Sequence, residues 1–187
     1  MDGISRKRFA AAIVAIVITL LAAPGASAGP PAATTYFAGP STSVLALNRL
    51  PDGKLYLSVS VQGQPLNLFV DTGAATILDC QVAKALGRPL TKTDDTATSL
   101  IGEADRYVTT VDLVLGGLKI RNQPVSCLDL VQIRALHERM SWPRLDGLIG
   151  TDLLSMLRAR LDYDRRTLTI RRPDARSAAE ENRLRQQ

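Results

Sequence analysis

A single acidic side chain closes a run of apolar residues in the first half of the chain. Asp71 follows the apolar residues 68–70 and precedes Thr72, Gly73 and Ala74. A strand made of such apolar residues is expected in the interior, where an apolar environment disfavours the charged form of a carboxyl group. Thr72 adds a hydroxyl group, and Gly73 allows a second backbone segment to approach closely. Taken alone, Asp-Thr-Gly also fits an ordinary turn, in which an aspartate bonds its own backbone.

A second motif downstream combines the same kinds of residue. It reads Asp-Gly-Leu-Ile-Gly and begins at Asp146. Residues 151–160, which follow directly, have helical spacing, with Thr151 as a candidate N-cap. Residues 159–172, which overlap the end of that segment, predict two strands joined by a turn. Together with Asp71-Thr-Gly-Ala and the closing Leu-Asp-Tyr hairpin, this motif resembles the retropepsin-like aspartic proteases, and their bacterial exported members look nearest. The resemblance extends over about residues 50–172.

The resemblance implies a mainly β fold, a single lobe built as a closed β-barrel (the acid protease fold) with one or more short helices. The Asp-Thr-Gly loop is then expected at the floor of the lobe, beside the apolar-apolar-Gly segment 148–150, with a β-hairpin flap over the cleft. Each lobe of a two-lobed pepsin supplies one such catalytic motif, whereas this sequence has one, at Asp71. A complete catalytic pair therefore implies a homodimer with Asp71 from each protomer.

The chemistry that the resemblance implies is hydrolysis of a peptide bond by an activated water molecule. Two carboxyl groups about 3 Å apart cannot both ionise, so they share one proton. One takes a proton from the water while the other donates to the scissile carbonyl oxygen, which gives a tetrahedral intermediate without a covalent enzyme adduct. Thr72 is expected to bond across the dimer, and Gly73 to let the backbones approach while its amide holds the carboxylate. No cofactor is implied.

The flap is expected within residues 96–107, between the strands around Asp-Thr-Gly and the next long strand. Gly102 suits the tip of a hairpin, and Leu100 and Ile101 are candidates to cover a peptide or protein substrate. An ordinary polar loop is the alternative. The candidate substrate-binding residues at the floor of the cleft are Ala74, Leu148, Ile149 and Gly150.

An insertion lengthens the chain just before the second motif. Residues 130–146 contain the only histidine, His137, and the only tryptophan, Trp142. The simpler interpretation is a surface helix packed by Trp142 and Leu136, and the alternative is a lid that faces the substrate. No catalytic role is expected for His137, because aspartic chemistry needs no imidazole.

Two further acids lie in the second motif and the helix after it. Asp146 is expected to bond backbone groups rather than substrate. Asp152, in the first turn of the predicted helix, is expected to interact favourably with the helix dipole. Neither acid is assigned a catalytic role.

The remaining pattern is that of a globular, mainly β chain. Apolar residues make up 45% and charged residues 22% of the sequence, which excludes a disordered chain. Period-two alternation predicts a strand over 54–62, the turn 63–65 starts a hairpin with a second strand, and 76–78 is a short third strand. Asp79 is a candidate N-cap of a short helix that Gly87 ends. Further strands are expected over 106–115 and 118–130, joined as a hairpin at Gly116 and Gly117, and a helix over 132–140.

The N-terminus predicts export. Residues 1–28 combine basic residues, an apolar run and a small-x-small site, so a signal peptide with cleavage after Ala28 is expected. An uncleaved membrane anchor, near membrane-protein substrates, is the alternative, although the run is shorter than the roughly 18 residues of a spanning helix. Residues 29–43 are expected to be a flexible leader, 44–172 the protease domain and 173–187 a disordered polar tail.

The charge pattern does not favour nucleic acid as a partner. Removal of the signal peptide takes away three basic residues and one acid, so the net charge falls from +5 to +3. A nucleic-acid-binding surface needs a basic stripe with interleaved aromatic residues, and the sequence has none. The expected partners are a peptide or protein substrate and a second copy of the chain, in the periplasm or outside the cell.

Only two cysteines are present, Cys80 and Cys127. In an oxidising compartment they are able to form one disulfide bond, and the alternative is two buried, reduced side chains that act as small apolar residues. With the lone histidine they do not form a set of metal ligands.

These patterns predict an exported, homodimeric aspartic endopeptidase. Asp71 is its catalytic acid and base, supported by Thr72 and Gly73. The alternative is a non-catalytic module of the same fold that binds peptides or other proteins in the periplasm, because a fold by itself does not determine a function.

Overall fold

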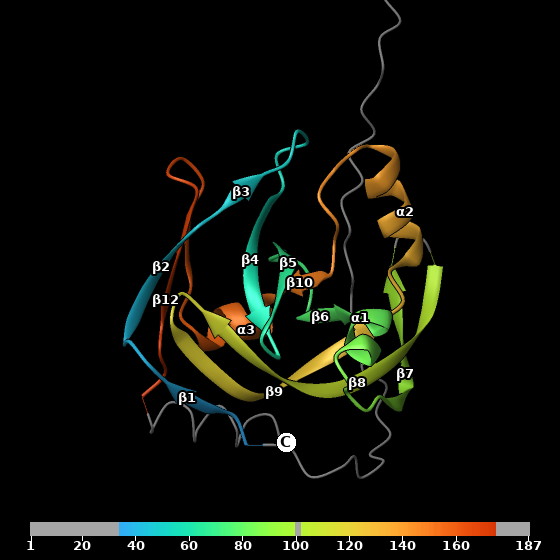
Figure 1. Ribbon diagram of the computed structural model, residues 1–187, viewed down its shortest axis with the longest axis horizontal. Coiled ribbons are helices and arrows are strands. Elements are labelled where there is room, and N and C mark those ends of the chain that lie inside the picture. Colours follow the sequence, from blue (N-terminus) through green and yellow to red (C-terminus); the bar gives the residue numbers. More distant parts are fainter. Residues whose placement is uncertain (1–33, 100–101, 175–187) are drawn as a thin grey trace, which may run out of the picture.

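A closed ring of strands forms the centre of the computed structural model, which describes residues 34–99 and 102–174. Its strands are β4 (Leu55–Val61), β5 (Gln64–Val70), β6 (Ile77–Asp79), β8 (Gly102–Leu115), β9 (Leu118–Leu128) and β10 (Gly147–Ile149). Strands β9, β6, β10, β5, β4 and β8 pair in this order, and β8 pairs again with β9, which closes the ring (Figure 1). The mainly β fold predicted from the sequence is confirmed.

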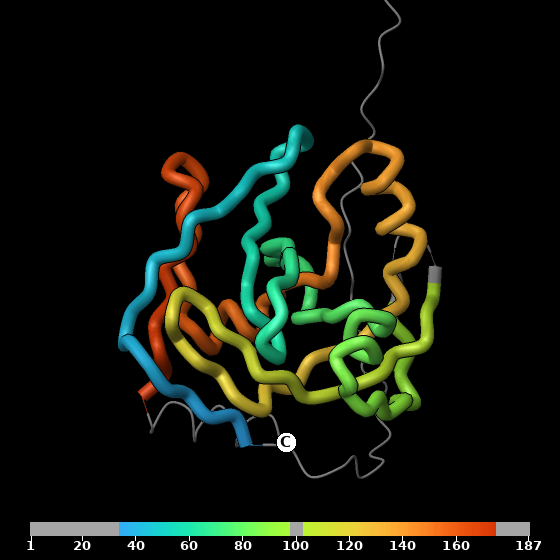
Figure 2. Tube along the Cα trace, viewed as in Figure 1, coloured from blue at the N-terminus to red at the C-terminus, as the bar shows by residue number. Residues whose placement is uncertain are grey.

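Shorter elements surround the ring. The peripheral strands β1 (Tyr36–Ala38), β3 (Asn48–Arg49) and β7 (Thr91–Ser99) pair with β9, β4 and β8, respectively. A second sheet contains β11 (Arg160–Asp162), β12 (Thr167–Arg171) and β2 (Thr42–Ala46) in that order. The helices are α1 (Cys80–Ala85), α2 (Val131–Arg139) and α3 (Thr151–Met156). The first and last described strands lie on the same side of the molecule (Figure 2).

The expected flexible leader, residues 29–43, differs from the structure. Its described part contributes β1, which pairs antiparallel with β9, and the first two residues of β2, which pair with β12. The aromatic residues Tyr36 and Phe37 favour a strand, and the edges of β9 and β12 supply hydrogen-bond partners for the two segments. The predicted signal peptide and nearly all of the predicted tail lie outside the described residues. Among the described helices, none is long and apolar enough to cross a membrane.

Strand β4 has the alternating pattern that the sequence predicts. Leu55, Leu57, Val59 and Val61 are buried, and the residues between them are more exposed. The turn that follows consists of Gln62 and its glycine neighbour, with φ angles of 50° and 81°, as a two-residue hairpin turn requires. The predicted turn at 63–65 is therefore placed one residue too late.

Other predicted boundaries agree with the structure. The Asp79 carboxylate accepts a hydrogen bond from Gln81 N at the start of α1, and Gly87 follows that helix with a φ angle of 68°. Gly116 and Gly117 turn the chain between β8 and β9 with φ angles of 55° and 85°. In each case a residue type that tolerates the required backbone or cap geometry marks the end of an element.

Helix α3 is shorter than the sequence predicts. The predicted helix covers 151–160, but α3 ends at Met156, and Arg158 has a φ angle of 45°, which is incompatible with a continued helix. Gly150 occupies the N-cap position. Thr151 is the first helical residue rather than the cap.

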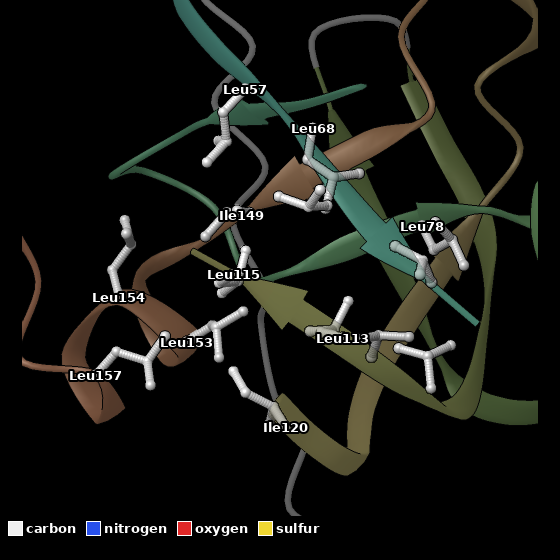
Figure 3. Close-up of a cluster of buried hydrophobic side chains, with 14 of the residues drawn as sticks. Leu57, Leu68, Leu78, Leu113, Leu115, Ile120, Ile149, Leu153, Leu154 and Leu157 are labelled. Carbon is white, nitrogen blue, oxygen red and sulfur yellow. The ribbon is translucent and has the colours of Figure 1, made fainter. Parts of the chain in front are cut away.

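The ring and helix α3 enclose one large apolar cluster. Leu57, Leu68 and Ile149 point from the ring strands towards Leu153 and Leu157 of the segment that begins with α3 (Figure 3). All of these side chains are buried. Burial of this apolar area is the main stabilising term for such a fold, and it fixes β5, β10 and α3 relative to one another.

Candidate active site

The Asp-Thr-Gly loop begins where β5 ends. Asp71 N donates to Ile149 O at 3.0 Å, so the first residue of the loop is attached to the end of β10. Gly73 N donates to Asp71 Oδ1 at 2.8 Å, which fixes the carboxylate within its own loop. In the single chain Asp71 is half-buried, and Thr72 and Gly73 are exposed. The apolar strand therefore shields this carboxylate only in part.

Strand β10 lies directly beside the Asp-Thr-Gly loop. It pairs parallel with β5, with Leu148 opposite Phe69, and antiparallel with β6 on its other side. A Cβ atom on Gly147 would lie 2.3 Å from a backbone oxygen, and a Cβ atom on Gly150 would lie 2.1 Å from Ala75 C. The two glycines of Asp-Gly-Leu-Ile-Gly are thus explained by close approach of backbone segments.

Gly73 does not need its missing side chain for packing within the single chain. Within residues 34–99 and 102–174, a Cβ atom there would meet only Asp71 Oδ1 within 4 Å, at an ordinary distance of 3.4 Å. The close approach that the sequence predicted for this glycine is not found among the described residues. Its amide does hold the carboxylate, and an approach by a second protomer stays a prediction.

A hydrogen-bond network at the end of the loop was missed by the sequence interpretation. Asp152 Oδ1 accepts hydrogen bonds from Thr76 N at 2.8 Å and from Thr76 Oγ1 at 2.6 Å. Gly150 N donates to Thr76 Oγ1 at 3.1 Å. Asp152 lies in the first turn of α3, as its expected interaction with the helix dipole requires, and its carboxylate in addition joins α3 to the Asp-Thr-Gly loop.

Asp146, by contrast, has the role that the sequence predicted. Its Oδ2 accepts a hydrogen bond from Asn67 N at 2.9 Å, and Arg144 Nε lies 2.8 Å from its Oδ1. Asp146 is therefore a structural residue that bonds the backbone of β5.

A pocket of about 240 Å³ opens beside Thr72. Its lining comes from the end of β5, from the Asp-Thr-Gly loop and from the α3–β11–β12 region, and it is mostly apolar. The residues are Val70, Thr72, Thr151, Leu154, Ser155, Arg158, Ala159, Leu161 and Leu168. The exposed face of the Asp-Thr-Gly loop thus continues into a recess next to it.

The hairpin expected at the flap position is present as β7 and β8. Ser99 pairs with Gly102, so Gly102 begins the second strand, while the flap candidates Leu100 and Ile101 lie outside the described residues. Nearer the base, Arg106 Nη1 lies 2.9 Å from Asp95 Oδ2. Arg106 Nε also donates to an oxygen of β9, Ser126 Oγ, at 3.1 Å. The base of the hairpin is thereby tied to the ring, and contact of its tip with a substrate stays a prediction.

The insertion before the second motif forms α2 and packs on a second buried cluster. His137 lies between Phe69 and Trp142, with ring centroids 5.4 Å apart on each side in edge-on geometry. Its Nδ1 is 2.8 Å from Pro143 O. Trp142 therefore packs this segment as predicted, but the buried partner on the helix is His137, whereas Leu136 is only half-buried.

A buried ion pair attaches α2 to the ring. Asp79 is fully buried, and Arg134 Nη1 lies 2.8 Å from its Oδ2. That oxygen accepts no hydrogen bond of good geometry from the described residues. Burial raises the pKa of the Asp79 carboxyl group above its usual value, although the Gln81 amide and the Arg134 guanidinium act in the opposite direction.

We expect the raised pKa of Asp79 to appear in the stability of the protein. Because the folded pKa lies above the unfolded one, the contribution of Asp79 is fully present below pH about 4 and is lost as the pH rises through the folded pKa. Asp79→Asn keeps an acceptor for Gln81 N but does not titrate. The unfolding free energy of the wild type minus that of Asp79→Asn should therefore fall with rising pH, as measured by urea denaturation.

Asp162→Asn is the matched control of opposite sign. A hydrogen bond from Arg165 N lowers the pKa of the Asp162 carboxyl group, so its contribution is present at high pH and is lost as the pH falls through the folded pKa. The corresponding difference for Asp162→Asn should rise with pH and be smaller, because this carboxyl group is solvent-screened. Parallel slopes for the two variants would contradict the assignment for Asp79.

The two cysteines are neighbours in the interior. Cys127 lies on β9 opposite Leu78, two residues before Cys80 at the start of α1. Both are buried and unbridged, and their thiol groups contact each other. Burial raises the pKa of Cys80 to about 11 and that of Cys127 to about 12. The disulfide bond stays a prediction for an oxidising compartment, and the reduced pair is the form described here.

These pKa values predict slow alkylation of the folded, reduced protein. At pH 8 only about one Cys80 in a thousand is a thiolate, the reactive form, and both side chains are covered. Iodoacetamide should modify neither cysteine until guanidinium unfolds the chain, after which mass spectrometry should show two adducts. Rapid modification of the native protein would contradict the buried placement, whereas a protein without adducts even after unfolding would be the disulfide form.

The comparisons with known proteins show the family of the chain. The family model described as aspartyl protease matches residues 57–153, which include both motifs. No curated protein matches the chain. The chain belongs to the aspartyl protease family, and the resemblance to retropepsin-like aspartic proteases stated from the motifs is confirmed.

Several solved structures are similar to this chain. A retropepsin-like aspartic protease from Rickettsia conorii has 21% sequence identity and a TM-score of 0.47, with 74% of this chain and 93% of that chain covered. EIAV protease in complex with the inhibitor HBY-793 has 20% identity and a TM-score of 0.46, with 62% and 98% covered. The retroviral protease-like domain of Ddi1 from Leishmania major has 18% identity and a TM-score of 0.44, with 63% and 87% covered.

Proposed function

We propose that this protein is an aspartic endopeptidase that acts as a homodimer, with Asp71 of each protomer forming the catalytic pair. The observation that carries the proposal is the state of the Asp-Thr-Gly loop in the single chain. Its carboxylate is fixed by the Gly73 amide and its backbone by β10, while Thr72 and Gly73 remain exposed. Because the sequence contains one Asp-Thr-Gly motif, the second carboxyl group has to come from another protomer.

The exposed loop and the pocket beside it support an interface at this position. A second copy that covers Thr72 and the mostly apolar pocket removes apolar area from water. It also completes the burial of Asp71, which strengthens electrostatic interactions at the reacting atoms.

The proposed mechanism needs no group other than the two carboxyl groups and water. The paired carboxyl groups hold one proton between them. One accepts a proton from the attacking water as the other protonates the carbonyl oxygen, so the tetrahedral intermediate forms without charge separation across the site. Gly73 N keeps the carboxylate oriented throughout.

We further propose that the enzyme is exported, with cleavage of the signal peptide after Ala28, and works in the periplasm or outside the cell. The basic and apolar segments of residues 1–28 support this proposal. An uncleaved anchor would instead keep the enzyme close to membrane-protein substrates. Mass spectrometry of the protein isolated from its producing cell distinguishes the cleaved form from the anchored form.

The function is tested by incubating the purified mature chain with a mixed peptide library at several enzyme concentrations. We expect new peptide termini, found by mass spectrometry, and a specific activity that rises with enzyme concentration until the dimer is saturated. Sedimentation in the same concentration range should show the monomer converting to a dimer. A chain that binds peptides, leaves them intact and stays monomeric at high concentration would instead be the non-catalytic module.

A further inference from the structure

We propose that Asp152 is a positioning residue for the catalytic carboxylate and acts through Thr76. The proposal rests on the proposed function, because it concerns the loop that carries Asp71. Asp152 neither belongs to the Asp-Thr-Gly motif nor lines the pocket beside it. Its side chain nevertheless reaches the loop from the first turn of α3, across a sequence separation of 76 residues.

The contact between the two residues is short, and its Thr76 side is buried. One carboxylate oxygen, Asp152 Oδ1, accepts from both the amide and the hydroxyl group of Thr76, at 2.8 and 2.6 Å. Thr76 is only 3% exposed. Because one oxygen accepts two hydrogen bonds from the same residue, the contact holds the end of the loop to the first turn of α3.

The Thr76 hydroxyl group also forms a hydrogen bond with the neighbouring backbone. While it donates to Asp152, it accepts from Gly150 N at 3.1 Å. The preceding residue, Ile149, accepts from Asp71 N through its carbonyl oxygen. Asp152, Thr76 and Gly150 therefore form a continuous chain of contacts that ends one residue from the backbone that holds Asp71.

A second set of bonds holds the middle of the loop to the same short segment. Ala74 O accepts from Thr151 N at 2.8 Å and from Thr151 Oγ1 at 3.1 Å. The loop is thus attached at its start, its middle and its end to residues 149–152. With Asp152 removed, the end of the loop loses its acceptor, and the Thr76 amide is left buried without a partner, which is unfavourable.

The position of the carboxylate is what this attachment controls. Catalytic groups must be held within about 0.5 Å of their productive geometry, and a misplacement of 1 Å costs about 100-fold in rate. Among the described residues, Asp71 is hydrogen-bonded by its own loop and by β10. Asp152 is consequently expected to affect the rate of the chemical step more than the binding of substrate.

An interaction with the helix dipole is the competing explanation, and the two make different predictions. A favourable dipole interaction depends on the negative charge of Asp152. Positioning depends on an acceptor at Oδ1, which asparagine retains. Helix α3 is also only six residues long, so its dipole is small.

The experiment compares Asp152→Ala with Asp152→Asn in peptide cleavage. We expect Asp152→Ala to lower kcat by about 10- to 100-fold with KM changed less than about threefold, and Asp152→Asn to restore most of kcat. Asp164→Asn removes a charge from the exposed turn between β11 and β12 and should leave kcat unchanged. Equal losses of kcat in Asp152→Ala and Asp152→Asn, or no loss in either, would overturn the proposal.

Thr76 supplies a second, independent pair of variants. Thr76→Ser keeps the hydroxyl group, whereas Thr76→Val replaces it with a methyl group of similar size. We expect Thr76→Val to lower kcat and Thr76→Ser to retain it. Because Asp152 acts through Thr76, the losses in Asp152→Ala and Thr76→Val should not add in the double variant, and full additivity would count against the chain of contacts.

Hydrogen–deuterium exchange tests the positioning role of Asp152 without a measurement of catalytic activity. In Asp152→Ala, peptides that cover residues 71–77 and 149–152 should exchange faster, while peptides from β4 should keep their protection. Asp152→Asn should resemble the wild type. If the wild type cleaves no peptide but this pattern is seen, the proposed function fails and the positioning contact stands. Unchanged exchange over 71–77 in Asp152→Ala overturns the positioning role itself.

Discussion

Replacing Asp71 with asparagine should give a folded dimer that cleaves peptides at least about 10⁴-fold more slowly than the wild type. The substitution removes both carboxyl groups of the proposed pair at once, so the general base that activates water and the general acid that protonates the carbonyl oxygen are lost together. Each of these contributions is worth about 10²- to 10⁴-fold by itself. The measurement is kcat/KM on a peptide identified from the library.

The fold should survive this change, because asparagine has the size of aspartate and keeps an acceptor for Gly73 N. The hydrogen bond from Asp71 N to Ile149 O involves only backbone atoms and is also retained. The midpoint of thermal unfolding should therefore be unchanged or higher, since two carboxyl groups no longer face each other in the dimer. Loss of activity together with loss of folding would leave the variant uninformative about chemistry, and the mixing experiment avoids that ambiguity.

In the mixing experiment, an excess of Asp71→Asn is added to a fixed amount of wild type, and time is allowed for subunits to exchange. Most wild-type protomers then pair with a variant protomer, so the activity should fall although the amount of wild type is constant. A variant that does not fold or dimerise cannot suppress activity in this way. If each protomer worked alone, the added variant would have no effect, and the proposed two-protomer site would be wrong.

Local patterns account for what could be predicted from the sequence. The alternating residues of β4, the Asp79 cap of α1 and the paired glycines between β8 and β9 each depend on a few neighbouring residues. Such features are set by side-chain periodicity and by backbone freedom, which a single sequence displays directly. The Asp-Thr-Gly motif was identifiable for the same reason, since its apolar approach and its glycine are contiguous.

Contacts between distant residues account for what could not be predicted. Asp152 meets Thr76, and Asp79 meets Arg134, across long stretches of chain. Nothing in the neighbourhood of either acid indicates its partner, because the ring topology alone brings them together. Strand β1 was missed for a similar reason: Tyr36 and Phe37 favour strands, but they lie in a segment rich in Pro, Gly, Ser and Thr, and their pairing partner on β9 is distant in sequence.

The glycines of the second motif carry the other large expected effect. Gly150→Ala should destabilise the protein by about 3 kcal/mol or more, at the upper end for overpacked sites. The φ and ψ angles of Gly150, −101° and −177°, suit alanine, so no backbone strain is involved. The cost comes entirely from the new methyl group, which would lie 2.4 Å from Ala74 O and 2.1 Å from Ala75 C.

Gly63→Ala is the matched control. Gly63 has a φ angle of 81°, which is unfavourable for alanine, but no atom of the described residues lies within 4 Å of the added Cβ. Its cost should be about 1–2 kcal/mol and purely conformational. Urea denaturation of the two variants therefore compares a steric clash at Gly150 with backbone strain at Gly63. A smaller loss of stability in Gly150→Ala than in Gly63→Ala would contradict the close approach of Gly150 to residues 74–75.

The two variants should differ still more in catalysis than in stability. The atoms that the Gly150 methyl group would meet are backbone atoms of the loop that carries Asp71, so they cannot rotate away as a side chain would. The clash can be relieved only by separating residues 149–152 from that loop, which displaces the carboxylate from its support on β10. Under conditions in which both variants are folded, Gly150→Ala should therefore lose kcat by about 100-fold or more, while Gly63→Ala, on a hairpin turn remote from these contacts, keeps it. A folded Gly150→Ala with normal kcat would show that the loop tolerates such a displacement, and the positioning role of Asp152 would then fail for the same reason.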